Sequence, residues 1–184
     1  MNIHLKIIKN DLEQLNNFIL ENLKSSITFI TIVGKYIIQN PGKKLRPIIL
    51  ILTTKIFKVN SHQNVIKLAC AIEFIHIATL LHDDVIDKTY LRRRKKSVNK
   101  KWNNKTAILI GDYLYSRAFQ LLVEIKNYEI LEILVKTTNT IVEGEILQLI
   151  NQGKIKTAFT KCIKIIEKKT AKLFETSAFI GIKL

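Results

Sequence analysis

The segment HIATLLHDDVIDKTYLRRRKK, residues 76–96, changes from apolar to acidic to basic within one predicted helix and the loop after it. It contains three of the five Asp residues of the chain, Asp83, Asp84 and Asp87. Because the chain carries 30 Lys and Arg against only 15 Asp and Glu, such a concentration of acid needs a specific cause. The helix that carries these acids is therefore the first candidate for a functional element.

This helix is predicted to run from about His62 to Asp87 and to occupy the centre of the fold. Its middle, LACAIEFIHIATLL, is apolar on nearly all sides, which is typical of a helix buried within a bundle. Apolar residues recur at helical spacing elsewhere too, and no segment shows sustained alternation of period two. Further helices are predicted at about 3–23, 26–39, 43–57, 105–126, 128–150 and 155–180, with a loop at 88–103.

The predicted fold class is all-α, in a single domain over residues 1–184. This length and a hydrophobic content of 47% are sufficient for one buried core, and no linker or repeat divides the chain. The most apolar runs are too short for a membrane span, or they carry Glu73 and His76. The N-terminus lacks the apolar core of a signal peptide, and Cys70 and Cys162 have no metal-type spacing. We expect a cytoplasmic protein with no transmembrane segment.

The net charge of +15 favours an anionic partner, such as nucleic acid, an acidic membrane surface or phosphorylated small molecules. Because Lys is frequent throughout the chain, a biased composition is an alternative source of this charge. A nucleic-acid partner is the least favoured, since the charge is diffuse and only Tyr90 and Trp102 could stack on bases near the basic loop.

The acidic cluster has a spacing that suits a metal ion. On a helix, Asp83 and Asp87 lie four residues apart on one face, with Asp84 beside them. The carboxylates repel one another, and at a helix C-terminus the macrodipole disfavours each of them by roughly 0.3–1 kcal/mol. Bound Mg2+, which prefers oxygen ligands and substrate phosphates, would offset this cost. The alternative is a surface acid cluster that Lys88 and residues 92–94 neutralise.

Two basic groups lie on either side of this cluster in the sequence. Lys43 and Arg46 are at a predicted helix start, where backbone N–H groups favour anions, and Arg92 and Arg93 follow the acids. Arg suits bidentate phosphate contacts, whereas Lys acts as a point charge. Two basic groups around a metal-binding acid cluster are what two diphosphate groups would require.

Six segments carry a family resemblance: PGKKLRP (41–47), EFIHIATLLHDDVID (73–87), LRR (91–93), GDYLYSRAFQ (111–120), EGEILQL (143–149) and KTAKLFE (169–175). Their order and spacing resemble those of the trans-polyprenyl diphosphate synthases, and of the bacterial octaprenyl diphosphate synthases in particular. The resemblance implies an isoprenoid-synthase-type helical bundle. It also implies a prenyltransferase that adds isopentenyl diphosphate to an allylic diphosphate such as farnesyl diphosphate, with Mg2+ assisting the departure of diphosphate.

The resemblance also implies a role for each candidate site residue. Asp83, Asp84 and Asp87 form the first Asp-rich motif, with Asp83 and Asp87 as the expected direct Mg2+ ligands. Without this motif, His76 would instead be interpreted as a core histidine, because His is often partly buried. The other matches are Arg92, Lys169 and Thr170 at the allylic diphosphate, and Lys43, Arg46, His76 and Arg93 at isopentenyl diphosphate.

Product length is expected to depend on small residues of the same helix. Ala78 and Thr79, five and four positions before Asp83, leave room for a growing chain, and aliphatic residues continue this face. We therefore expect a long product, beyond farnesyl. The resemblance implies an octaprenyl-like diphosphate of the kind used for isoprenoid quinones.

The sequence departs from the family pattern in three places. Pro41 replaces the first Gly of a GGK motif, and Arg94 replaces a Gly whose conformational freedom suits the loop. No second Asp-rich motif occurs up to Leu184, since no Asp follows Asp112. We therefore expect an incomplete bundle without its C-terminal helices and with exposed apolar faces. Such a chain would be a truncated or split synthase that forms a homo-oligomer or needs a partner chain, or else a non-catalytic subunit.

Overall fold

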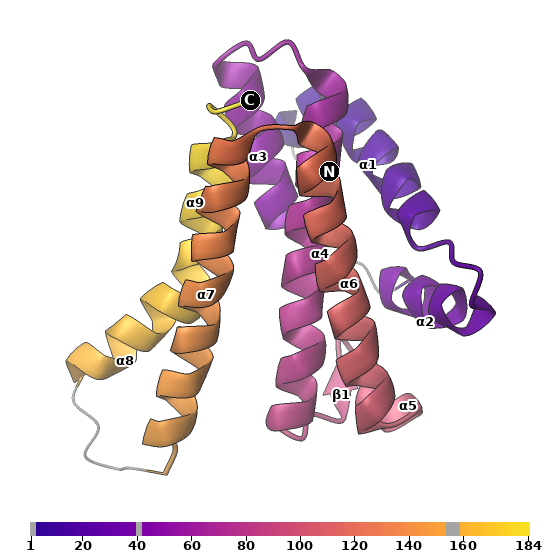
Figure 1. Cartoon of the computed structure of the whole chain (residues 1–184), viewed down its shortest axis with the longest axis vertical. Helices are drawn as coiled ribbons and strands as arrows, with labels where there is room; N and C mark the ends of the chain where they lie inside the picture. Colours follow the sequence, from indigo (N-terminus) through magenta and orange to yellow (C-terminus); the bar gives the residue numbers. More distant parts are fainter. Residues whose placement is uncertain (1–2, 40–41, 154–158) are drawn as a thin grey trace.

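The protein is built almost entirely of helices (Figure 1). The structure, a computed structural model, describes residues 3–39, 42–153 and 159–184. The helices up to the acidic cluster are η1 (Ile3–Ile8, a 3-10 helix), α1 (Lys9–Asn22), α2 (Thr28–Ile38), α3 (Leu45–Ile56) and α4 (His62–Ile86). The later elements are β1 (Leu91–Arg92), β2 (Lys95–Lys96), α5 (Val98–Lys101), α6 (Asn104–Ile125), α7 (Tyr128–Asn151), α8 (Phe159–Ile166), the π-helix η2 (Glu167–Ala171) and α9 (Lys172–Ile180).

The all-α prediction is confirmed, and α4 ends one residue before its predicted bound. The loop predicted at 88–103 is wrong in part, because this segment contains the β1–β2 hairpin and α5. The helix predicted at 155–180 is divided into α8, η2 and α9, and residues 154–158 lie outside the described ranges. Pro41, the first departure from the family pattern, also lies outside them.

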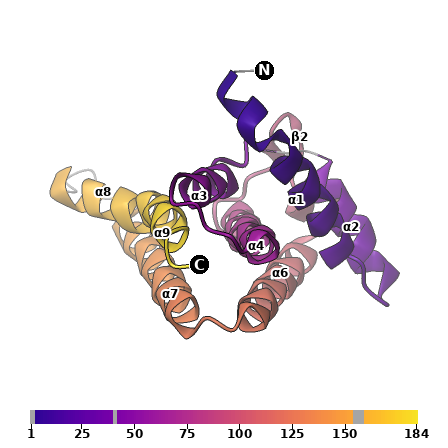
Figure 2. The same ribbon diagram turned by 90° about the horizontal axis from the view of Figure 1, so that it is seen from above.

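Helix α4 is the centre of the fold, as its apolar sequence predicts. More than half of its 25 residues are buried, and Phe74 is the largest side chain with no exposed surface. Its most extensive packing partner is α6, with α3 and α1 on other sides (Figure 2). Among the described residues, α4 is also the one helix long and apolar enough to cross a membrane. Because 72% of its most apolar window is buried inside the protein, it is a core helix of this bundle.

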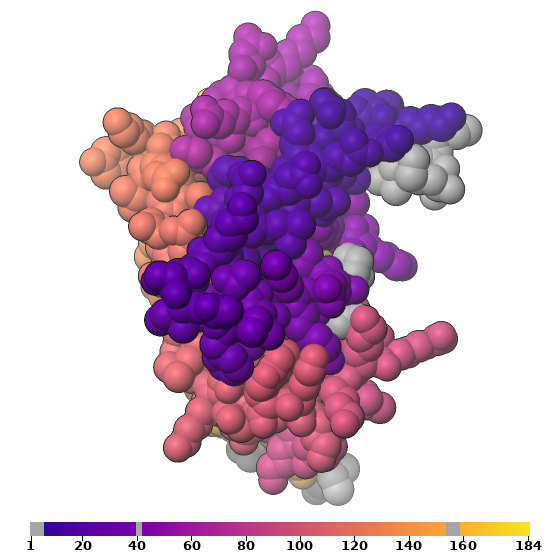
Figure 3. Space-filling model, turned by 90° about the vertical axis from the view of Figure 1, so that its right-hand side faces the viewer, coloured from indigo at the N-terminus to yellow at the C-terminus, as the bar shows by residue number. Residues whose placement is uncertain are grey.

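The remaining helices lie on two sides of α4 and α6. Helices α1 and α2 cover one side, where they form the indigo surface of Figure 3. Helix α9 packs against α3 and α7 on the other side, while α6 and α7 diverge from the turn that joins them (Figures 1 and 2). The expected exposure of apolar faces is confirmed on α7 and α8. The exposed apolar side chains there include Val142, Ile146, Leu149, Ile150, Phe159, Ile163 and Ile166.

The β1–β2 hairpin turns through two arginines. Leu91 pairs with Lys96 and Arg92 with Lys95, which leaves Arg93 and Arg94 as the turn. Their φ angles are 50° and 65°, so both adopt the left-handed conformation. Two-residue hairpins favour such turns because they match the twist of the strands. A residue with a Cβ atom is nevertheless disfavoured there by about 1–2 kcal/mol, and Arg94 occupies this conformation without the help of glycine.

Replacing Arg94 by glycine should therefore stabilise the protein. The substitution removes the unfavourable Cβ contact, and the greater freedom of glycine in the unfolded chain offsets only part of this gain. We expect Arg94→Gly to raise the free energy of unfolding by about 0.5–1 kcal/mol in urea denaturation. The matched control is Lys95→Gly, a strand position without a positive φ, which should lower stability. Equal losses in the two variants would contradict the prediction.

Candidate active site

The three acids at the end of α4 face different surroundings. Asp84 is only 2% exposed, and its carboxylate accepts hydrogen bonds from Arg92 of β1. Arg92 Nε lies 3.0 and 2.8 Å from the two oxygens, and Nη2 lies 2.6 Å from Oδ1. The hydrogen bond to Asp84 is the main cause of the raised pKa of Arg92, and the charges of Asp84, Asp83 and Asp87 add to it. Asp84 therefore fixes Arg92 at the end of α4.

Asp83 points toward the other side of the molecule, where a lysine of η2 meets it. Lys169 Nζ lies 3.3 Å from Asp83 Oδ2 and 2.6 Å from Oε2 of Glu145 on α7. Burial raises the pKa of Asp83, and Lys169 partly offsets this effect. Burial likewise raises the pKa of Glu145, to which the charges of Asp83 and Asp87 contribute. Burial lowers the pKa of Lys169, but the hydrogen bond to Glu145 and the charge of Asp83 outweigh it, so the net shift is upward.

The π-helical turn η2 comes close enough to α7 to place Lys169 here. A Cβ atom on Gly144 would lie 2.8 Å from Lys168 Cβ and 2.9 Å from the Lys169 backbone N, so only glycine fits. On either side of Gly144, Glu143 pairs with Lys168 at 2.5 Å and Glu145 pairs with Lys169. The EGE sequence of α7 therefore holds η2 against α7 through two ion pairs.

The acids offer the oxygen ligands that Mg2+ prefers, but they are not already gathered around one point. Within the described residues, no group of three His, Cys, Asp or Glu side chains is arranged to hold a metal ion. Both oxygens of Asp84 are engaged by Arg92, whereas Asp87 is exposed and Asp83 already faces a cation, the Lys169 ammonium. Because these neighbouring carboxylates disfavour one another's charge, a cation is favourable beside them. The donor chemistry thus fits Mg2+, with Asp83 and Asp87 as the available ligands.

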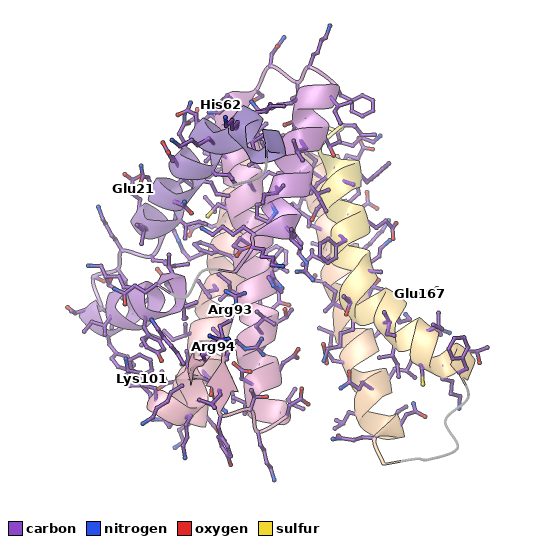
Figure 4. All side chains as sticks on the ribbon, turned by 180° about the vertical axis from the view of Figure 1, so that it is seen from behind. Glu21, His62, Arg93, Arg94, Lys101 and Glu167 are labelled. Atoms are coloured by element: carbon purple, nitrogen blue, oxygen red, sulfur yellow. The ribbon has the colours of Figure 1, made fainter. Side chains whose placement is uncertain are left out.

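A second group of charges forms a pocket at the start of α3, which we call the basic pocket. Lys43, Arg46, His76 and Arg93, the four residues matched to one diphosphate, all line it. The space between them measures ≈ 440 Å³, and Lys44, Leu45 and Glu73 complete the lining. Arg93 and its neighbour Arg94 lie beside α4 (Figure 4). The structure therefore brings together residues that are 50 positions apart in the sequence.

His76 enters the basic pocket as a neutral side chain. Burial, together with the charges of Arg46, Arg93 and Arg92, lowers the pKa of His76 to about 3. Its Nε2 lies 3.2 Å from Arg46 Nη1. Since a guanidinium has only donors, Nε2 accepts this hydrogen bond and Nδ1 carries the proton. The Arg46 guanidinium also lies 4.2 Å from the centroid of the Phe174 ring, so His76 and Phe174 together orient Arg46.

Three predicted site residues lie outside these two groups. Ala78 has no exposed surface, and Thr79 is half-buried and donates to the His76 carbonyl at 2.7 Å. Thr170 is exposed, next to Lys169 in η2. The roles assigned to these three residues by resemblance stay predictions.

Sequence reasoning also missed three residues that the structure places in the site. Glu145 and Phe174 stand inside the EGEILQL and KTAKLFE segments, but helical spacing does not indicate that they meet Lys169 and Arg46. Glu73 begins the EFIHIATLLHDDVID segment without an assigned role, although an acid in a buried helix is itself a pattern that indicates nearby cations. The fold brings it to the wall of the basic pocket.

Known proteins with the same pattern were found by sequence. The polyprenyl synthetase family profile matches residues 28–184. Octaprenyl diphosphate synthase of Escherichia coli is 38% identical over 175 residues, which are 94% of this chain and 53% of the relative. The all-trans-nonaprenyl-diphosphate synthase (geranyl-diphosphate specific) of Rhodobacter capsulatus is 39% identical over 168 residues, 91% of this chain and 52% of the relative. Heptaprenyl diphosphate synthase component 2 of Geobacillus stearothermophilus is 33% identical over 146 residues, 79% of this chain and 45% of the relative.

A solved structure agrees with these relatives in fold. The polyprenyl synthase of Caulobacter crescentus, complexed with calcium and isoprenyl diphosphate, matches with a TM-score of 0.94 and 35% identity. The match covers 97% of this chain and 54% of that chain, so the bundle is incomplete relative to its neighbour, as expected. The chain spans about half the length of the relatives that it matches. By profile, sequence identity and fold, the chain belongs to the polyprenyl synthetase family.

Proposed function

We propose that residues 1–184 form one truncated domain, the N-terminal part of a long-chain polyprenyl diphosphate synthase. The reaction adds isopentenyl diphosphate units to an allylic diphosphate, farnesyl diphosphate in the simplest case. The product is an octaprenyl-like diphosphate for isoprenoid quinone biosynthesis in the cytoplasm. The E. coli and R. capsulatus relatives, which are named for long prenyl products, support this proposal.

The observation that carries the proposal is that two consecutive arginines contribute one to each of the two groups of charges. Arg92 contacts Asp84 at the acidic end of α4, and Arg93 lines the basic pocket. Their hairpin therefore offers one cation to each of two anionic groups. A reaction that joins two diphosphate substrates requires such a pair of neighbouring anion sites.

The basic pocket is the proposed site for isopentenyl diphosphate. Lys43 supplies a mobile point charge, while Arg46 and Arg93 supply planar sets of donors that match phosphate oxygens. His76 stays neutral at physiological pH because its pKa is lowered to about 3. It therefore positions Arg46 by accepting a hydrogen bond and adds no charge of its own.

The acidic end of α4 is the proposed site for the allylic diphosphate. Arg92 and Lys169 bind phosphate oxygens, with Thr170 as a neighbouring donor, and Asp83 and Asp87 hold Mg2+. When bound, Mg2+ supplies positive charge that stabilises the leaving diphosphate. Lys169 contacts Asp83 and Glu145 in this structure, so a diphosphate competes with these carboxylates for its donors. The calcium and isoprenyl diphosphate complex of the Caulobacter protein supports a divalent cation in this role.

We further propose that a second polypeptide completes the site. The exposed apolar stripes of α7 and α8, such as Ile146 and Ile150 on α7, require cover from another part of a protein. The Geobacillus relative is by its name one component of an enzyme, which supports a partner chain. A second copy in a homo-oligomer is the other candidate. The alternative proposal is a non-catalytic subunit that binds a full-length synthase.

Incubation with Mg2+, farnesyl diphosphate and labelled isopentenyl diphosphate tests the proposed reaction. The chain should be assayed alone and mixed with the part of the E. coli relative that lies outside the match. We expect labelled long-chain product in the mixture, and its loss when Asp83→Ala replaces the wild-type chain. The absence of product in every mixture would contradict prenyl transfer by this chain.

Binding of Mg2+ together with inorganic diphosphate should raise the thermal stability of the chain. Ligands present at about a hundredfold excess over Kd stabilise a protein by about 2.7 kcal/mol. Asp83→Asn should abolish the shift, because it removes a proposed Mg2+ ligand. Asp112→Asn is the matched control on α6, where the acid is exposed and outside the site, and it should retain the full shift. Equal shifts in both variants would argue against Asp83 as a ligand.

Product length should fall when a large side chain is placed near Asp83 on α4. In Ala78→Phe and, separately, Thr79→Phe, we expect chromatography of the extracted products to show shorter prenyl chains. Because Ala78 is fully buried, its variant also loses about 1–3 kcal/mol of stability from overpacking. Thr79 is half-buried, so its variant separates the length effect from the stability effect. Unchanged product length in both folded variants would rule out this determinant.

A further inference from the structure

A second cavity lies between α2, α4 and the β1–β2 hairpin, and we call it the hairpin cavity. Its space, which includes open solvent, measures ≈ 640 Å³. Most of its wall is apolar, and nothing in the proposed reaction uses that wall. The apolar lining includes Ile37, Ile38, Ile77, Leu80, Leu81 and Val98.

Fixed contacts between its walls hold the hairpin cavity open. Tyr36 Oη of α2 donates to the Lys96 carbonyl of β2 at 2.7 Å, and the Trp102 ring packs edge-on against Tyr36 at 5.2 Å. Ser97 Oγ donates to the Thr89 carbonyl at 2.7 Å, which closes the base of the hairpin. These contacts set the distance of α2 from the hairpin in this structure.

The inner end of the cavity carries a buried acid without a complete set of partners. Glu73 lines the cavity and is 4% exposed, and its Oε2 has no hydrogen-bond partner among the described residues. A buried polar atom left in this state costs about 1–3 kcal/mol. Burial also raises the pKa of Glu73, while the charges of Lys44, Arg46 and Arg93 lower it. A ligand with a hydrogen-bond donor would satisfy this oxygen.

The other polar residues of the cavity are mainly cations. Lys44, Arg92, Arg93 and Lys96 line it, and they exceed the two acids, Glu73 and Asp84. Asp84 is already paired with Arg92. The remaining balance of charge therefore favours an anion beside the apolar wall.

We propose that the hairpin cavity binds a small amphiphile with an apolar body and an acidic phosphate head. The body packs against Ile77 and its apolar neighbours, and the phosphate charge meets Lys44 and Lys96. A singly ionised phosphate keeps one P–OH group, which donates to Glu73 Oε2. The apolar body, the phosphate charge and the P–OH group of such a ligand thus match the apolar wall, the cations and the unpartnered oxygen of the cavity, in that order.

The hairpin cavity and the basic pocket have Lys44, Glu73 and Arg93 in common. An amphiphile in the cavity therefore competes with a diphosphate in the basic pocket for the same cations. Under the proposed function, on which this step rests, a phosphorylated short isoprenoid would limit the access of isopentenyl diphosphate. The binding itself does not depend on that function.

Calorimetric titration with n-octyl phosphate, below its critical micelle concentration and without Mg2+ or prenyl substrates, tests the binding. We expect saturable binding that inorganic diphosphate weakens, and about tenfold weaker binding of n-octanol or inorganic phosphate, a loss of about 1.4 kcal/mol. Trp102 is the only Trp and contacts the cavity wall through Tyr36, so its fluorescence should change on the same titration curve. The absence of saturable binding would overturn the proposal.

Matched variants distinguish the two neighbouring sites. Lys96 lines only the hairpin cavity and Lys43 only the basic pocket. Lys96→Ala should weaken octyl phosphate about threefold, as expected for an exposed charge, and leave inorganic diphosphate unchanged. Lys43→Ala should do the reverse. Ile77→Phe, which fills the cavity, should weaken octyl phosphate about tenfold, and a thermal unfolding curve checks that this variant folds.

Two results would overturn the assignment to the cavity. If Lys43→Ala weakens octyl phosphate and Lys96→Ala does not, the amphiphile binds in the basic pocket. If none of the variants changes its affinity, the amphiphile binds to the exposed apolar faces of α7 and α8. Because these titrations contain no reaction components, failure of prenyl transfer would leave their outcome unaffected.

Discussion

Burial of α4 on nearly every side is the constraint on which the rest of the structure depends. A helix without a solvent-facing stripe has to be surrounded, and α1, α3 and α6 provide the surrounding surfaces. Its last turn emerges from this core, and there the sequence changes from apolar to acidic. The acids therefore stand on a support that packing holds rigid, which is what a site that must orient charged groups requires.

The buried and half-buried carboxylates each pair with cations from elements distant in the sequence. Asp84 takes Arg92 from the hairpin, Asp83 shares Lys169 of η2 with Glu145, and Glu73 lies among the cations at the start of α3. Buried charges need such partners because desolvation alone would be unfavourable by several kcal/mol. Much of the net charge of +15 lies on exposed lysines, whereas these cations have defined neighbours. The same pairings bring together the hairpin, α4, α7 and η2, so the electrostatics of the site also stabilises its architecture.

Most of the fold could be predicted from the sequence because apolar periodicity reports which helix faces are buried. The central position of α4 followed from a middle segment that is apolar on nearly all sides, and the membership of the basic pocket followed from a resemblance over nearly the whole chain. The hairpin turn at Arg93 and Arg94 could not be predicted, since both residues adopt a conformation that their type disfavours. The meeting of Lys169 with Glu145 depends on how closely η2 approaches Gly144, which is a tertiary contact without a periodic pattern. The hairpin cavity is likewise defined by the distance between elements, which no local pattern reports.

The orientation of α8 relative to α9 depends on the number of residues in the π-helical turn η2. A π turn contains one residue more than the α-helical turn that would replace it. Loss of a single residue in Glu167–Ala171 would let α8 and α9 join as one regular helix, and α8 would rotate by about 100° about their common axis. The apolar stripe of Phe159, Ile163 and Ile166 would then face a different direction, while α9 kept its packing on α3 and α7. A deletion of one codon in this segment would therefore change the surface of the protein, because the apolar stripe of α8 would be offered to a partner in a different direction.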